Sequence, residues 1–318
     1  MGQSITRKYA FMPPLPSYSS SLPNVWIQRP KGDPDHKIPG LFIDPSAHGS
    51  PPRRHAVTIL YSHGNAEDIG QMVEHLQYIS RTARVNIFAY DYPGYGLNLG
   101  EQPTESNVNR DETLAFGYLV KERGIDPRSI IIMGRSIGSG PAVYLANYLS
   151  KRARPELGCP EPGMFGGLML QSGVASAVRV VSDAAAHIPF TDIFQNIDLI
   201  DAVKAPVCIM HGKVDRVVPF QHGVMLWDKV KPEHKWRFLQ LEEADHNDLH
   251  IVAQAEWITT IIDFADMVEH TLADAPAAAA AAAPAASATT DDAPATTDDA
   301  PDHASEPKAA SSLSHDDD

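Results

Sequence analysis

Ser136 stands in the pentapeptide Gly134-Arg-Ser-Ile-Gly138, after an apolar run typical of a strand and before a segment typical of a helix. Glycine on both sides of a serine in this context predicts a sharp, strained turn that places the hydroxyl above the edge of a sheet. A serine hydroxyl is a weak nucleophile by itself, so it needs a base, and the base needs an acid to orient it. The pentapeptide therefore predicts nucleophilic attack on an acyl carbon.

A base and an acid follow Ser136 in the chain order that this arrangement requires. Asp215 comes shortly after the apolar run Val207–Met210, and His246 comes after the predicted strand Trp236–Leu241. Loops that follow parallel strands gather at one edge of an α/β sheet, so we expect the three side chains to meet there. The predicted catalytic residues are Ser136, Asp215 and His246.

The negative oxygen that forms in acyl transfer needs main-chain amide donors. Ile137 is predicted to supply one, because it directly follows the nucleophile. The second is expected in an earlier loop, where Gly64 permits a turn and Asn65 is predicted to donate. His63, in the same loop, is assigned to shaping that loop and not to the role of base, because His246 fits the chain order.

No cofactor and no metal is expected. His246 and His250 have the spacing of a zinc-binding helix, but Asn247 stands where that motif needs glutamate. Gly138 does not begin a dinucleotide-binding loop, since Val143 stands where the last glycine of that motif would be. The remaining polar residues of these loops are interpreted as structural, namely Asp245 as a loop residue, Asp248 as a helix N-cap and His211 at a strand end.

Strands and helices alternate through the middle of the chain. Strands are predicted at Val25–Gln28, Gly40–Ile43, Ala56–Tyr61, Val85–Tyr90, Ser129–Met133, Met164–Leu170, Val207–Met210 and Trp236–Leu241. Helices are predicted at Glu67–Ala83, Glu105–Gly124, Ile137–Lys151, Gln221–Val230 and Asp248–Leu272. This alternation predicts an α/β fold, with a mostly parallel central sheet, helices on both faces and an antiparallel N-terminal edge.

The composition divides the chain into three parts. Residues 1–22 show no periodicity and are expected to form an extended arm, residues 23–272 carry the alternating pattern, and residues 273–318 are expected to form a disordered, alanine-rich acidic tail. Nine acidic residues and one lysine in 275–318 supply much of the net charge of −14, which does not favour nucleic acid as a partner. The segment 174–205 is too long for a bare connection and is predicted to be a small lid.

Two features concern the compartment. Cys159 and Cys208 lie far apart and suggest no disulfide framework, which favours a reducing compartment. The N-terminus fits the myristoylation pattern, with Gly2, Thr6 and basic residues after it, so Gly2 is the predicted lipidation site. The predicted location is cytoplasmic and peripheral, on the cytoplasmic face of a membrane; the alternative is an unmodified terminus.

Several stretches of the sequence form a recognisable set, namely Ala10-Phe-Met-Pro-Pro14 with Tyr18, His63-Gly-Asn-Ala66, Gly70-Gln-Met72, Asn86-Ile-Phe88, Asp91-Tyr92 with Gly94-Tyr-Gly96, Ser136-Ile-Gly138 and His246-Asn-Asp248. Together they resemble the α/β-hydrolase superfamily, and within it the α/β-hydrolase-domain-containing "seventeen" group of membrane-associated protein depalmitoylases. The resemblance covers about residues 10–267 and implies an α/β-hydrolase fold. It also implies hydrolysis of thioesters on S-acylated protein cysteines.

Departures from that group keep alternatives open. Its members have a cysteine-rich N-terminus, whereas the first 158 residues here contain no cysteine. Arg135 places a charge beside the nucleophile, Asp245 replaces a usual glycine, and the acidic tail has no counterpart in the group. Hydrolysis of a carboxylic ester, a lipid or a peptide by the same triad is one alternative. A non-catalytic scaffold with a hydrolase fold is the other.

Overall fold

The computed structural model describes residues 11–30, 37–51, 53–180 and 192–274. The chain divides into two units, Met1–Pro276 and Ala277–Asp318, and every described residue belongs to the first. The predicted acidic tail, 273–318, lies outside the described residues except for Ala273 and Asp274, which the structure places at the end of the last helix and not in a disordered segment. The predicted lipidation site Gly2 also lies outside the described residues.

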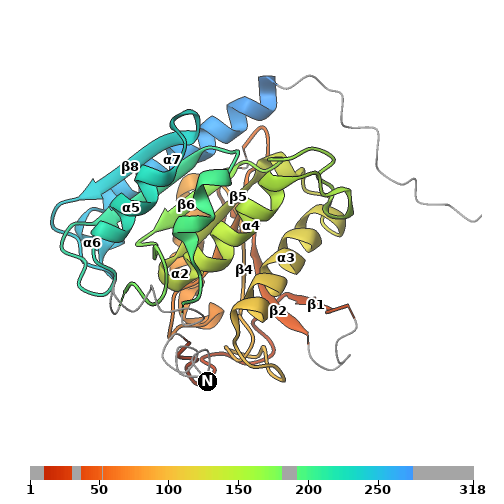
Figure 1. Ribbon diagram of the computed structural model, residues 1–318. Coiled ribbons are helices and arrows are strands. Elements are labelled where there is room, and N and C mark those ends of the chain that lie inside the picture. Colours follow the sequence, from red (N-terminus) through yellow and green to blue (C-terminus); the bar gives the residue numbers. More distant parts are fainter. Residues whose placement is uncertain (1–10, 31–36, 52, 181–191, 275–318) are drawn as a thin grey trace, which may run out of the picture. The chain divides into compact units, whose positions relative to one another are not determined.

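A twisted sheet forms the centre of the first unit (Figure 1). Among the described residues it has eight strands in the order β1-β2-β4-β3-β5-β6-β7-β8. The strands are β1 (Val25–Ile27), β2 (Ile38–Ile43), β3 (Thr58–Ser62), β4 (Asn86–Tyr90), β5 (Ile130–Arg135), β6 (Gly167–Gln171), β7 (Val207–Gly212) and β8 (Lys235–Leu241). β1 pairs with β2 and β2 with β4 antiparallel, and the remaining pairs are parallel. The predicted fold class, with its antiparallel N-terminal edge, is confirmed.

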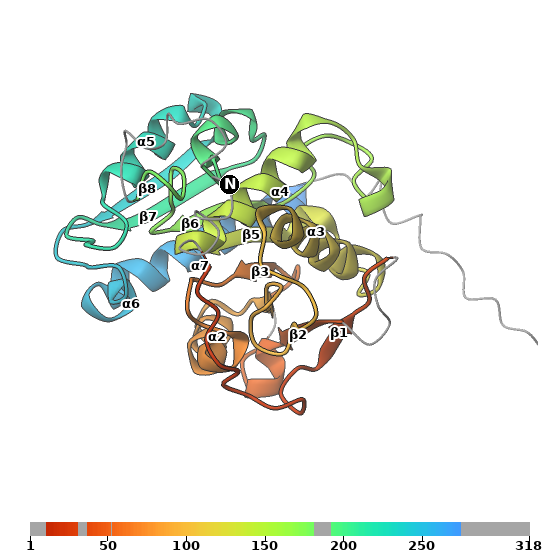
Figure 2. The ribbon, with the colours of Figure 1, turned by 60° about the horizontal axis from the view of Figure 1, so that its bottom comes forward.

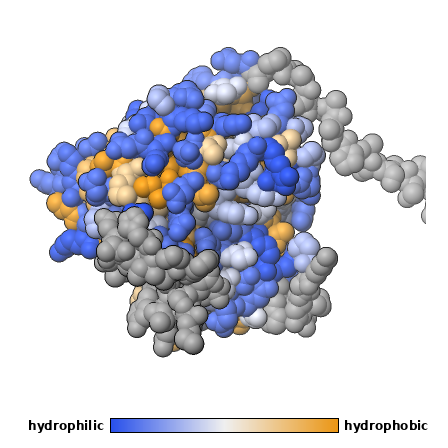
Figure 3. Space-filling view, viewed as in Figure 1, coloured by the Kyte–Doolittle hydropathy of each residue, from blue (hydrophilic) through white to orange (hydrophobic). Residues whose placement is uncertain are grey.

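Helices cover both faces of the sheet (Figure 2). One layer contains α3 (Glu105–Lys121), α4 (Ser139–Lys151) and α5 (Gln221–Lys229), and the other contains α2 (Ile69–Ala83) and α7 (Gln254–Asp274). Neighbouring strand residues supply both cores because their side chains alternate between the faces: Leu60 packs in the first core, and Ile59 and Tyr61 in the second. On the face seen in Figure 3, hydrophobic residues show as patches among hydrophilic ones. The buried apolar residues of α3, α4 and α5 lie in the core between these helices and the sheet.

The five predicted helices are all present but shifted at one or both ends, and two of the differences are informative. α2 begins at Ile69 and not at Glu67, because the Asp68 carboxylate accepts the amide of Gln71 and caps the helix. The predicted helix 248–272 is two helices, α6 (Leu249–Val252) and α7, with Ala253 between them outside helical geometry. No helix in the described part of the chain is long and apolar enough to span a bilayer.

The predicted lid, 174–205, falls partly outside the described residues, which omit 181–191. Its described portion contains two short 3₁₀ turns, Asn196–Asp198 and Ile200–Ala202. The ring of Phe194 lies so close to α4 that a Cβ at Gly140 would come within 2.3 Å of it. This portion therefore packs directly on the helix that follows the predicted nucleophile.

Candidate active site

The turn at the end of β5 is as tight as the sequence predicts. Ser136 has a φ of 54°, a left-handed conformation that is unfavourable for a residue with a side chain. A Cβ at Gly134 would lie 2.4 Å from the carbonyl oxygen of Gly138, and a Cβ at Gly138 would lie 2.2 Å from that of Ser62. Any other residue at either position would push the turn off the sheet, so the two glycines permit the strained serine.

The three residues predicted to be catalytic form one chain of hydrogen bonds. His246 Nε2 lies 2.9 Å from Ser136 Oγ, and His246 Nδ1 lies 2.8 Å from Asp215 Oδ2. All three side chains are buried, although they stand 110 and 31 residues apart in the sequence. An imidazole between a hydroxyl and a carboxylate is the arrangement that removes a proton from serine and later returns it.

The surroundings of Asp215 keep it ionised. Its Oδ1 accepts the amides of Val217 and Val218 at 2.9 and 2.8 Å. Burial would raise the pKa of this carboxyl, but hydrogen bonding from His211 and His246 outweighs burial and holds the pKa well below its usual range. A carboxylate at this place favours the His246 tautomer with hydrogen on Nδ1, which leaves Nε2 free to accept the proton of the serine.

Asp245, predicted only as a loop residue, joins the loop after β7, which carries Asp215, to the loop after β8, which carries His246 and is called the histidine loop below. Asp245 Oδ1 accepts the amides of Arg216 and His246 at 2.9 and 2.8 Å, and Oδ2 accepts Arg216 Nε at 2.6 Å. Asp248 stands at the N-cap position of α6 as predicted. Its carboxylate, however, accepts the amide of Asp245 at 2.7 Å and makes no capping bond to the helix. The aspartate pair therefore shapes the histidine loop.

The residues predicted to form the oxyanion hole lie in two different loops, the nucleophile turn and the loop after β3. Ile137 directly follows Ser136 in a 3₁₀ turn. Asn65 is anchored by its side chain, because its Oδ1 accepts from the amide of Met12 at 2.9 Å, from Tyr95 Oη at 2.6 Å and from the amide of Ala66 at 3.1 Å. Donation to an oxyanion by the amides of Ile137 and Asn65 stays a prediction.

His63 lies in the same loop and makes its bonds away from the serine. Its ring is fully buried and stacks on Tyr92 with centroids 4.0 Å apart. Nδ1 lies 2.8 Å from the carbonyl oxygen of Gly64, and Nε2 lies 3.5 Å from Asp91 Oδ1. Burial lowers the pKa of His63, but the Asp91 and Glu67 carboxylates and the carbonyl of Gly64 together outweigh burial and raise it. These contacts agree with a role in shaping the loop.

The described part of the predicted arm, 11–22, contacts the active-site loops, which composition alone did not indicate. The amide of Met12 bonds the Asn65 side chain, and the buried ring of Phe11 meets that of Phe194 edge-on, with centroids 5.8 Å apart. The arm therefore lies between the loop that carries Asn65 and the described end of the predicted lid.

Two further arm residues fix its course. The amide of Ser17 donates to Asp68 Oδ2 at 2.7 Å, and the Ser17 hydroxyl donates to Oδ1 of the same carboxylate. The Tyr18 hydroxyl donates to Asp91 Oδ2 and accepts the amide of Leu97 at 3.1 Å. Asp68 and Asp91 lie beyond the ends of β3 and β4, so the arm is bonded to the edge of the sheet where the triad lies.

A buried carboxyl group lies beneath this edge. Glu112 of α3 accepts hydrogen bonds from Ser62 and Tyr90 at Oε2, while its buried Oε1 has no hydrogen-bond partner within the described structure. Burial raises the pKa of Glu112 to about 7, although the two hydrogen bonds act in the opposite direction. The protonated acid is therefore favoured in the folded protein.

The raised pKa of Glu112 predicts a loss of stability with rising pH. The folded state holds this proton until the pH passes about 7, whereas the unfolded chain releases it near 4.5. The bound proton on Glu112 therefore contributes fully to the free energy of unfolding below pH 4.5, and this contribution, about 3 kcal/mol, is lost as the pH rises to 7. Urea unfolding of the parent and of Glu112→Gln across this range measures it, and the variant should lose much less stability than the parent. Glu122→Gln, at the exposed end of the same helix, is the control, and parallel curves for Glu112→Gln and the parent would contradict the prediction.

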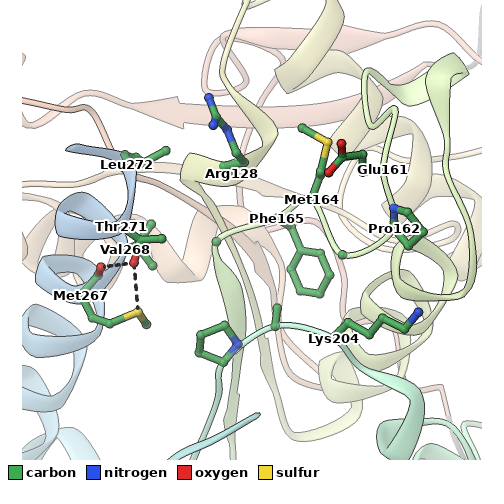
Figure 4. Close-up of a pocket in the computed structure, with 14 residues that line it drawn as sticks. Arg128, Glu161, Pro162, Met164, Phe165, Lys204, Met267, Val268, Thr271 and Leu272 are labelled. Atoms are coloured by element: carbon green, nitrogen blue, oxygen red, sulfur yellow. Dashed lines mark hydrogen bonds between the residues drawn. The ribbon is translucent and has the colours of Figure 1, made fainter. Parts of the chain in front are cut away.

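A pocket of about 290 Å³ lies at the other edge of the sheet, just before β6 and β7 begin (Figure 4). Phe165 lines it ahead of β6, and Met267 and Leu272 line it from α7. Its Arg128 is paired with Asp126 at 2.6 Å. None of the residues predicted to be catalytic lines this pocket, so the pocket is not the candidate active site.

In the described ranges there is no cluster of three or more metal-binding side chains.

The sequence is similar to several curated proteins. It is 32% identical over 281 residues to α/β-hydrolase domain-containing protein aho-3 of Caenorhabditis elegans, a match that covers 83% of this chain and 78% of that protein. It is 37% identical over 199 residues to human α/β-hydrolase domain-containing protein 17B, covering 62% of each. It is 35% identical over 201 residues to protein 17C of Xenopus tropicalis, covering 62% of this chain and 58% of that protein. The match therefore spans less than two thirds of the length of these vertebrate proteins. No protein-family model matches the chain.

Solved structures show the same fold at low identity. An esterase of Pyrococcus furiosus has a TM-score of 0.57 at 16% identity, with 80% of this chain and 98% of that one covered. Mouse α/β-hydrolase domain-containing protein 10 has a TM-score of 0.53 at 16% identity, with 76% and 98% covered. At such identities the likeness carries the fold alone.

Proposed function

Since the chain belongs to the α/β-hydrolase-domain-containing 17 family, we propose that this α/β hydrolase is a serine hydrolase that removes acyl groups, above all palmitoyl groups, from S-acylated protein cysteines. The observation that carries the proposal is the chain of hydrogen bonds from Ser136 through His246 to Asp215. The choice of a thioester rests on the family resemblance, because the triad itself does not select the leaving group.

The proposed first step transfers the acyl group to the enzyme. His246 Nε2 takes the proton of Ser136 while the serine oxygen attacks the acyl carbon, and Asp215 stabilises the imidazolium that forms. The amides of Ile137 and Asn65 donate to the carbonyl oxygen as it becomes negative. When the carbon–sulfur bond breaks, the leaving sulfur takes the proton from His246, and the acyl group remains as an ester on Ser136.

The second step repeats the chemistry with water. His246 removes a proton from a water molecule, whose oxygen attacks the acyl carbon of the Ser136 ester. The ester bond then breaks, the serine oxygen regains the proton from His246, and the free fatty acid leaves. The same two steps would cleave a carboxylic ester, so the substrate class needs a direct comparison.

Two peptides of the same sequence test the substrate class, one carrying S-palmitoyl cysteine and the other O-palmitoyl serine. We expect the full chain to hydrolyse the thioester with a kcat/KM at least about 10-fold higher than that of the ester. Hydrolysis of the ester alone would assign the triad to carboxylic esters. Absence of both hydrolysis and fluorophosphonate labelling would favour a non-catalytic scaffold.

The location of the enzyme is a further part of the proposal. We propose that Gly2 carries a myristoyl group and brings the enzyme to the cytoplasmic face of a membrane, where S-acylated proteins are found. A single chain of this kind holds a membrane only weakly, so a second contact is required. Mass spectrometry of the N-terminal peptide tests the modification. A peptide without the mass of a myristoyl group would contradict the proposed myristoylation.

A further inference from the structure

Arg135 is the last residue of β5 and directly precedes the nucleophile Ser136. Its side chain is mostly buried and bonds two other loops. Nη1 lies 2.7 and 2.6 Å from the two carboxylate oxygens of Glu67, and Nη2 lies 2.7 Å from Asn247 Oδ1. One guanidinium thus joins the nucleophile turn, the loop after β3 and the loop after β8.

Glu67 extends this connection to the main chain of its own loop. Its Oε1 also accepts the amide of Gly64, and a Cβ at Gly64 would lie only 2.8 Å from that oxygen. Burial raises the pKa of Glu67, but the charges of Arg135 and His63 and the hydrogen bonds from Arg135 and the Gly64 amide together outweigh burial and lower it, so the group is a carboxylate. The carboxylate fixes the residue that precedes Asn65, whose amide is predicted to face the oxyanion.

The Glu67–Arg135 pair connects loops that the strand pairing of the sheet does not hold together. β8 stands three places from β5 in the strand order, and its loop carries the histidine, so backbone pairing alone does not couple that loop to the nucleophile turn. The two charged side chains are only 13% and 14% exposed. A pair shielded to this extent is held more firmly than a surface ion pair, and removal of one partner leaves a largely buried charge uncompensated.

We infer that the Glu67–Arg135 pair is a positioning device for the proposed acyl transfer. Through Gly64 it sets the loop that offers an oxyanion donor, and through Asn247 it holds the loop of His246. The guanidinium is not available to bind an anionic part of the substrate, because its described bonds go to protein groups. The inference rests on the proposed function, and it places the effect on kcat and not on substrate binding.

The experiment compares Glu67→Gln, Arg135→Gln and the double variant in the full chain. With the S-palmitoyl peptide, we expect each single variant to lower kcat by about 10- to 100-fold while KM changes less than about 3-fold, because slight misplacement of the reacting groups affects the transition state. The rate of fluorophosphonate labelling should fall in parallel. The kcat of the double variant should be no lower than that of the less active single variant, since the two residues act as a unit.

Two further variants sharpen the comparison. Arg135→Lys can still pair with Glu67 but cannot also reach Asn247 with a second arm, so an intermediate kcat is expected. If Arg135→Gln fails to fold, the kcat of Arg135→Lys relative to the parent tests the positioning role. Arg128→Gln is the matched control, because Arg128 makes an ion pair with Asp126 just before the same strand, at the opposite edge of the sheet. It should leave kcat unchanged.

Several results would overturn the inference. A raised KM with kcat retained would assign Arg135 to substrate binding. Unchanged kinetics, strictly additive losses, or a loss of kcat equal to the loss of folded protein in a thermal melt would leave no positioning role. If the parent is labelled at Ser136 and the variants react equally fast, the positioning role alone fails. If the parent is not labelled at all, the proposed function fails first, and this inference fails with it.

Discussion

Replacement of Ser136 by alanine is expected to abolish fluorophosphonate labelling and to lower kcat by about 10⁴- to 10⁶-fold. The serine oxygen is the only atom of the triad that would bond the acyl carbon, and its distance of 2.9 Å from His246 Nε2 gives it a base. The change removes one oxygen atom from a side chain that is already buried, in a turn whose shape depends on its glycines. Stability should therefore change little while activity is lost.

Labelling with a fluorophosphonate, followed by steady-state assay of the thioester peptide, measures this effect. Ser106→Ala is the control, because Ser106 is an exposed serine on α3, and it should be labelled at the rate of the parent. Labelling of Ser136→Ala at an undiminished rate would show that another residue is the nucleophile. Loss of labelling in both variants would point to misfolding or to a defective assay.

The arrangement of the triad could be predicted because it depends on features that recur in sequence. Gly134 and Gly138 mark a strand-to-helix turn with no room for side chains, and the structure shows why, with both positions in close contact with main-chain atoms. Asp215 and His246 each follow a strand of a parallel sheet, and the ends of such strands share one edge. The chain order of the three residues and their positions after strands were therefore sufficient to predict that they lie together.

The contacts that join the loops could not be predicted, because they depend on pairs of common polar residues far apart in the sequence. Glu67 and Arg135 stand 68 positions apart, and no periodicity links them. The helical pattern placed Glu67 inside a helix. Asp68 caps that helix instead, so Glu67 stays in the loop, where it pairs with Arg135.

The contacts of the arm and the break after α6 are two further features that the sequence did not predict. Ser17 and Tyr18 lie in a segment without periodicity, so their hydrogen bonds to Asp68 and Asp91 could not be read from the sequence. Ala253 interrupts the last helix although alanine favours helices, and neither glycine nor proline marks the site.

Replacement of Asp215 by asparagine is expected to lower kcat by about 10⁴-fold and to leave the fold intact. The amides of Val217 and Val218 both donate to Oδ1, so they will hold the amide oxygen of the new side chain at that place. Its NH₂ group must then occupy the place of Oδ2, which faces His246 Nδ1 at 2.8 Å. A donor at this place favours the tautomer with hydrogen on Nε2, and that nitrogen can no longer accept the proton of the serine.

The pattern of losses distinguishes this explanation from general damage to the site. If the wrong tautomer is the cause, Asp215→Asn combined with Ser136→Ala should be no slower than Ser136→Ala alone, because the carboxylate acts only through the serine. KM for the thioester peptide should stay near that of the parent, since Asp215 is buried behind the imidazole. Asp228→Asn, exposed on α5, controls for the loss of a carboxylate. A kcat for Asp215→Asn within about 10-fold of the parent would mean that another group orients His246.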